Sequence, residues 1–230
     1  MTARALSIVR VHTGAWPFLI AWPLGILLIA FLIPWTIFTL DPVENAETVG
    51  SVYSTFGMIS AFYITAMTQT FPFALGLGVT RRDYFAATLL CGAAQVLGFT
   101  VLLWVLSVIE GATDGWGVGM VMFGLQAKLT DNALLQLGGI AAMITVVVGL
   151  GLLIGAVHQR WRAVGLYTMF TGVLVVGGSA AILITWQQWW PEIGRWFADT
   201  PRVVPMVVLP AVIALATVAS SWMVLRRATV

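Results

Sequence analysis

The chain has 230 residues, of which 60% are hydrophobic and only 9% are charged. A typical soluble domain carries about 25% charged residues, so this sequence lacks the polar surface that a water-soluble fold of its length needs. The composition therefore excludes an ordinary soluble domain and indicates that lipid is the solvent for most of the chain.

Six long stretches without Asp, Glu, Lys or Arg predict six transmembrane helices. The stretches are between 23 and 33 residues long, and about 20 apolar residues are enough to cross the hydrocarbon core once. They are continuously apolar and do not alternate, which favours helices over a β-barrel. We expect an all-α polytopic membrane protein with one domain over 1–230, an interfacial helix at 1–14, and spans near 16–39, 53–75, 85–108, 134–156, 163–185 and 205–225.

Basic residues between the stretches predict the orientation. With a cytoplasmic N-terminus, eight of the 11 Lys and Arg residues fall on the cytoplasmic side, whereas eight of the nine acidic residues fall on the other side. Cytoplasmic loops of membrane proteins carry this excess of positive charge. We therefore expect both termini in the cytoplasm, and the high isoelectric point reflects topology and not a nucleic-acid partner. The cytoplasmic basic residues are Arg4, Arg10, Arg81, Arg82, Arg160, Arg162, Arg226 and Arg227.

The sequence contains few groups that could carry chemistry. All 20 charged residues lie outside the expected span cores, whereas ion pathways and proton relays usually show charges inside the membrane. His12 and His158 lie at expected cytoplasmic ends, far from any mid-membrane serine, and Cys91 has no second cysteine to pair with. No phosphate-binding loop is present. We expect a chain that is not itself an enzyme and binds no metal.

The loops and the glycines allow further predictions. The segment 110–131 is too short in its apolar part to span, and we expect it at the outer interface or over an external vestibule. The segment 187–202 is short and rich in tryptophan. Gly151 and Gly155 form a GxxxG pair of the kind that lets membrane helices approach closely, within one chain or between subunits.

The turn between the second and third spans, within 71–90, has a well-defined pattern. Gly76 and Gly78 can end the second helix in a left-handed conformation. Thr80 is expected as the N-cap of the next helix, and Thr80-x-x-Asp83 is similar to a capping box.

Arg81 and Arg82 follow directly in this turn and would be presented on a tight cytoplasmic corner. Two interpretations remain open. The arginines either only follow the positive-inside rule, or they form a docking site for a cytoplasmic partner.

The stretch TQTFPFALGLGVTRRDYFAATLL, the loop IEGATDGWGVGM (109–120) and the six-span hydropathy resemble ABC-2-type transporter permeases. The resemblance covers most of the chain and is greatest to small permease subunits of high-GC Gram-positive bacteria. The GVTRRDYF turn and the GWGVGM loop carry it more specifically than the hydropathy does.

This resemblance implies an exporter-like half-transporter in the bacterial plasma membrane, paired with a second permease copy or a paralogue. ATP and Mg would be bound by a separate ATPase subunit, and this chain would bind no cofactor directly. Members of the family often carry a re-entrant helix pair between spans five and six, for which 187–204 is short. The ATPase-coupling role would fall on Gly78, Thr80, Arg81, Arg82, Asp83 and Tyr84.

The second span is the most polar of the six, and in this family it commonly faces the transport path. Thr65, Thr68 and Gln69 share a helix face by their spacing. With Tyr63 they are our candidates for the substrate path. Hydrogen bonding of the threonines to their own helix is the alternative.

The sequence thus predicts a permease subunit that exports a hydrophobic or amphiphilic substrate, such as a lipid, peptide or drug, because the spans carry no fixed charge. The alternative is the substrate-binding membrane subunit of an energy-coupling vitamin importer, which also commonly has six helices. A subunit of that kind is expected to have small residues in its first span. This chain has Trp16, Trp22 and Trp35 there, which counts against the alternative.

Overall fold

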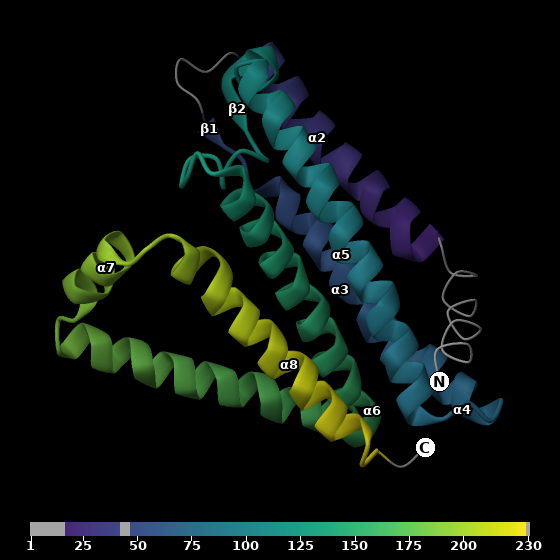
Figure 1. The fold of residues 1–230 in the computed structure, drawn as a ribbon. Coiled ribbons are helices and arrows are strands. Elements are labelled where there is room, and N and C mark those ends of the chain that lie inside the picture. Colours follow the sequence, from purple (N-terminus) through teal and green to yellow (C-terminus); the bar gives the residue numbers. More distant parts are fainter. Residues whose placement is uncertain (1–16, 42–46, 229–230) are drawn as a thin grey trace.

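A computed structural model describes residues 17–41 and 47–228 (Figure 1). The interfacial helix expected at 1–14 lies outside the described residues. The described residues are all-α apart from one pair of two-residue parallel strands, β1 (Glu47–Thr48) and β2 (Met120–Val121). The α-helices are α2 (Trp22–Leu40), α3 (Tyr53–Thr65), α4 (Phe71–Gly76), α5 (Arg81–Ala112), α6 (Ala133–Trp186), α7 (Trp190–Asp199) and α8 (Leu209–Leu225).

Short turns of other helix types extend several of these elements. The π-helical turns η1, η3 and η5 lead directly into α2, α4 and α8, whereas η2 is a 3₁₀ turn and η4 belongs to a loop. Their bounds are η1 (Pro17–Ala21), η2 (Gly50–Val52), η3 (Ala66–Thr70), η4 (Gly115–Gly119) and η5 (Val204–Val208).

Four of the described helices are long and apolar enough to cross a membrane, which makes this a multi-pass membrane protein. They comprise 17–40, 81–112, 133–186 and 204–225. The expected spans near 134–156 and 163–185 both lie in α6, which has 54 residues and is bent at Arg162 (φ 56°, ψ −148°). The expected span near 53–75 corresponds to α3, η3 and α4, whose Ser, Thr and Gln side chains make it more polar than the other four.

Two prolines explain how α2 is attached to the rest of the bundle. Proline has no N–H, so Pro23 leaves the Leu19 carbonyl without its helical donor. Gln95 Nε2 from α5 donates to that oxygen at 2.6 Å. Pro34 leaves the Ala30 carbonyl open in the same way, and a serine hydroxyl from η2 (Ser51) donates to it at 2.7 Å. In lipid an unpaired carbonyl is costly, so these side chains stabilise the packing of α2.

The core lies where α3, α5 and the first half of α6 meet. Tyr63 and Leu152 are among its fully buried side chains. A Cβ atom on Gly151 would lie 2.6 Å from the Ser60 carbonyl oxygen, and one on Gly155 would lie 2.6 Å from Met67 Cβ. The GxxxG pair therefore packs α6 against α3 and η3, which confirms its role in packing within one chain.

The second half of α6 leaves the bundle. We call residues 163–186 the α6 arm; it diverges from α8, which returns along the first half of α6 (Figure 1). Apolar side chains on the arm are open on all sides, with Leu174 74% and Val176 71% exposed. A Cβ atom on Gly172, or on either of the next two glycines of the arm, would meet no atom within 4 Å.

Candidate functional site

The turn after α4 ends that helix with a glycine in the left-handed region. Gly78 has φ 82°, its N–H donates to the Leu75 carbonyl at 2.9 Å, and the Val79 N–H donates to the Ala74 carbonyl at 3.1 Å. These two bonds form a Schellman motif, which satisfies the last carbonyls of the helix. The predicted left-handed helix end is confirmed at Gly78.

Thr80 caps the helix that follows. Its backbone is extended, and its hydroxyl accepts a hydrogen bond from the Asp83 N–H at 3.2 Å. The same hydroxyl donates to Asp83 Oδ2 at 2.9 Å. The carboxylate thereby lies in the first turn of α5, where the helix dipole favours negative charge. The predicted N-cap is confirmed, and both sides of the corner are closed by local hydrogen bonds.

The corner presents its side chains in two directions. Arg82 is exposed, whereas Arg81 is half-buried and its Nη1 donates to the Arg226 carbonyl at the end of α8, at 2.9 Å. Tyr84 points inward and is fully buried, with its hydroxyl donating to the Ala66 carbonyl at 2.7 Å. The Tyr84 side chain is therefore closed off in this conformation, and its hydroxyl bonds the corner to η3.

The four residues expected along a substrate path occupy different environments. Tyr63 is fully buried, and its hydroxyl donates to Gln95 Oε1 at 2.7 Å. Thr68 donates to the Ile64 carbonyl of its own helix at 2.9 Å. Thr65 is half-buried and Gln69 is exposed. Neither the cavity under the 110–131 loop nor the groove between α5 and α8 includes any of the four.

One residue that the sequence did not single out organises the loop after α5. Glu110 is only 3% exposed. Its Oε2 accepts from the Met122 and Phe123 N–H groups at 2.9 and 3.0 Å and from the Trp116 indole N–H at 3.2 Å, and its Oε1 accepts from the Gly124 N–H at 2.8 Å. Four donors converge on one carboxylate, which compensates for its burial.

Glycines allow the loop to wrap this closely around the carboxylate. Gly115 and Gly119 have φ 71° and 69°, and a Cβ atom on Gly124 would lie 2.7 Å from Glu110 Oε1. The glycine spacing in GWGVGM was the signal of such a turn in the sequence, but it did not reveal the acceptor at its centre.

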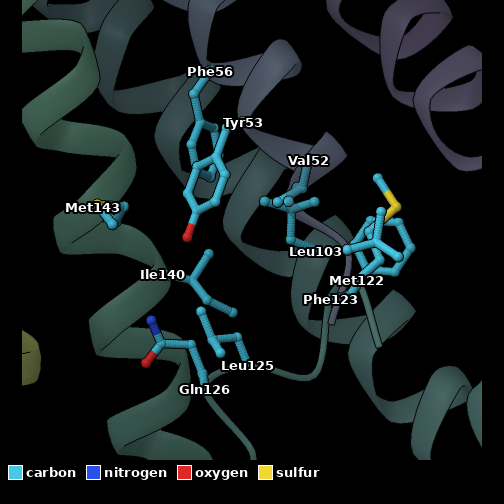
Figure 2. A pocket seen from close by; sticks show the side chains of 12 residues that line it. Val52, Tyr53, Phe56, Leu103, Met122, Phe123, Leu125, Gln126, Ile140 and Met143 are labelled. Atoms are coloured by element: carbon cyan, nitrogen blue, oxygen red, sulfur yellow. The ribbon is translucent and has the colours of Figure 1, made fainter. Parts of the chain in front are cut away.

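The wrapped loop lies over a cavity of about 80 Å³ between α3, α5 and α6 (Figure 2). Met122, Phe123 and Leu125 from the loop face Tyr53 and Phe56 at the start of α3 across this space. The walls are mainly apolar. The segment 110–131 thus covers a small cavity between the helices.

These features define an all-α multi-pass membrane protein with a rigid, arginine-bearing corner at one end and a carboxylate-organised loop at the other. No three His, Cys, Asp or Glu residues of the described segments lie together so that they could hold a metal ion. The chain matches no protein-family model, no curated protein and no solved structure.

Proposed function

We propose that this chain is the permease subunit of an ATP-binding-cassette transporter of the ABC-2 type, with six membrane spans and both termini in the cytoplasm. It would export a hydrophobic or amphiphilic substrate such as a lipid, peptide or drug. The observation that carries the proposal is the corner between α4 and α5, which is rigid, presents arginines and is bonded to the end of α8.

Charge supports the proposed orientation. The corner and the end of α8 together carry four arginines and one acid, which is the pattern of a cytoplasmic face. The other eight acidic residues lie in 41–47, 110–131 and 192–199. The residues of the proposed cytoplasmic cluster are Arg81, Arg82, Asp83, Arg226 and Arg227.

The corner is built to transmit force from a partner. The Schellman motif and the Thr80 cap hold α4 and α5 in a fixed relation, and the Tyr84 hydroxyl bonds to η3. A π-helical turn is a local irregularity that often lies at functional positions. Movement imposed on the corner by an ATPase subunit would therefore reach the middle of the second span through η3. ATP and Mg would be bound by that subunit.

The proposed cargo follows from the charge of the spans. The carboxylate of Glu110, at the end of α5, is already occupied by four donors. A path between two such chains would be weakly polar, which suits apolar or amphiphilic molecules better than ions. The exposed α6 arm offers a surface for the second permease copy or paralogue that such a path requires.

The decisive test is charge reversal at the corner. In the Arg81→Glu/Arg82→Glu variant we expect the ATPase subunit to be lost from the purified complex and export of an apolar dye to fall at least tenfold. Under the proposal the arginines bind an acidic surface of the ATPase subunit. The two glutamates would repel that surface, and placing like charges opposite each other at an interface costs several kcal/mol. Co-purification and dye efflux from vesicles measure the two effects.

The control is Arg195→Glu/Arg202→Glu, which reverses the same number of charges near α7. This variant should keep both the subunit and the export. If the corner variant retained its ATPase subunit and its transport, or if no ATPase polypeptide accompanied the wild-type complex, the proposal would be wrong.

A further inference from the structure

A groove runs between α5 and α8 on the surface of the bundle. It has a volume of about 630 Å³ and opens widely to the outside. Each helix contributes four residues at positions i, i+3, i+4 and i+7, so each wall is one face of a helix. Seven residues separate the ends of each wall, which corresponds to a length of about 10 Å at 1.5 Å per residue. The lining residues are Arg82, Phe85, Ala86, Leu89, Leu215, Val218, Ala219 and Trp222.

The groove is polar at one end and apolar along the rest of its length. Phe85 and Trp222 pack against each other at the arginine end, with ring centroids 5.2 Å apart. Arg82 is the one charged residue among the eight that line it. Leu89 and Leu215 line the end that lies deeper in the proposed bilayer, and Leu215 is 70% exposed. The order along the groove is thus cation, aromatic rings, then aliphatic side chains.

Three further arginines belong to the same corner as Arg82. Arg81 and Arg226 are in contact there, and Arg227 follows in sequence. Asp83 is the acid of this corner, and its carboxylate already accepts the Thr80 hydroxyl. An anionic group at the mouth would therefore meet the Arg82 guanidinium, and guanidinium groups bind phosphate well through their paired N–H donors.

We propose that this groove binds an anionic phospholipid of the surrounding bilayer. The phosphate lies against Arg82 at the mouth, and one acyl chain lies along the aliphatic walls between α5 and α8. Basic pockets between membrane helices recognise anionic lipid headgroups in this way. A soluble phosphate compound would leave the apolar walls unused, and a zwitterionic lipid such as phosphatidylcholine would bring, beside its phosphate, a quaternary ammonium group that the arginines repel. The inference needs only the chain itself and does not depend on its proposed transport function.

The test compares two lipids that differ only in the headgroup. The delipidated chain in detergent is titrated with phosphatidylglycerol or with phosphatidylcholine of the same acyl chains, and bound lipid is counted by native mass spectrometry. We expect wild-type protein to retain phosphatidylglycerol at least fivefold better. Arg82→Ala should abolish this preference, Arg82→Lys should restore part of it, and the matched control Arg195→Ala on α7 should leave it unchanged.

A second variant tests the acyl-chain part of the site. Ala219→Trp fills the groove while leaving every arginine in place, so it should weaken the binding of both lipids. Equal retention of the two lipids by wild-type protein, or an unchanged preference in Arg82→Ala, would overturn the proposal. It would also be overturned if Ala219→Trp dissociated a dimer without affecting lipid retention, because the groove would then be a contact between two copies of the chain.

Discussion

Glu110 shows how one residue can organise a loop of a membrane protein. Its carboxylate accepts three backbone N–H groups and one indole N–H from residues 6 to 14 positions later in the chain. The loop in turn places Met122 and Phe123 over the apolar cavity beneath it. In the sequence pattern Glu110 only marks the end of a span, whereas in the structure it anchors the loop that follows.

Removing this carboxylate should open the loop. In Glu110→Gln one of the two carboxylate oxygens is replaced by an NH₂ group, which would face a backbone N–H group of the loop. Two donors cannot bond to each other, and each buried polar group left without a partner costs about 1–3 kcal/mol. The reporter is Met122→Cys, at a position that is 3% exposed in the wild-type chain. We expect this cysteine to react with an impermeant maleimide at least tenfold faster with Glu110→Gln than with Glu110 in place. A tenfold change in rate corresponds to about 1.4 kcal/mol, which is within the expected cost. The measurement uses a Cys91→Ser background.

Asp114→Asn provides the matched control, because it neutralises a nearby acid and retains a residue type that tolerates the observed φ of 50°. It should leave the labelling rate unchanged. Equal rates in Glu110→Gln and the wild type would contradict the role assigned to this carboxylate.

At the scale of the element, α2 depends on side chains from other helices because its own prolines interrupt its hydrogen bonds. Gln95 satisfies the Leu19 carbonyl and also accepts the Tyr63 hydroxyl. The bond to Leu19 exists because Pro23 has no N–H to offer. This dependence can be measured by changing the proline and the glutamine together.

Gln95→Leu should destabilise the protein by about 1 kcal/mol, within the range found for hydrogen bonds between membrane helices. In a Pro23→Ala background an N–H is again available to the Leu19 carbonyl, so the same substitution should cost less. A double-mutant cycle of unfolding in mixed micelles measures the difference. Gln136→Leu, at a buried glutamine on α6, should cost the same in both backgrounds. Additive effects of Gln95→Leu and Pro23→Ala would show that the two residues are not coupled.

The corner between α4 and α5 is the element that the local sequence determines most completely. Gly78, Thr80 and Asp83 lie within six residues of one another, and their bonds are short-range backbone and cap interactions. Both its left-handed residue and its N-cap were predicted correctly. The local sequence makes no prediction of the direction of Tyr84, because its inward position depends on the Ala66 carbonyl of a different helix segment.

At the scale of the whole molecule, the α6 arm is exposed along almost all of its length. A Cβ atom added to Gly172, Gly177 or Gly178 would meet no atom within 4 Å, in contrast to one on Gly151 or Gly155 in the first half of the same helix. Small residues on an open helix face permit close approach of another helix. Under the proposed function, that helix belongs to the second permease copy or paralogue.

A cysteine at Leu174, in a Cys91→Ser background, should form a disulfide-linked dimer in oxidised membranes several-fold more efficiently than one at Leu97. Both positions are well exposed, at 74% and 66%, but Leu97 lies on α5 and is expected to face lipid. Gel mobility without reductant measures the product. Comparable cross-linking at the two positions, or none along the arm, would count against a contact between copies at this surface.

The amino-acid sequence by itself determined that this is an all-α multi-pass membrane protein, because charge spacing and apolar run length reflect the bilayer directly. It also determined the caps of the α4–α5 corner, which depend on neighbouring residues. Only the tertiary structure decided that the expected spans near 134–156 and 163–185 follow each other with only a kink at Arg162 between them. It also decided that Gln95 donates to a carbonyl at the start of α2 and that Glu110 accepts hydrogen bonds from a loop. These features depend on contacts between residues far apart in the chain, and hydropathy and local spacing carry no information about which distant groups meet.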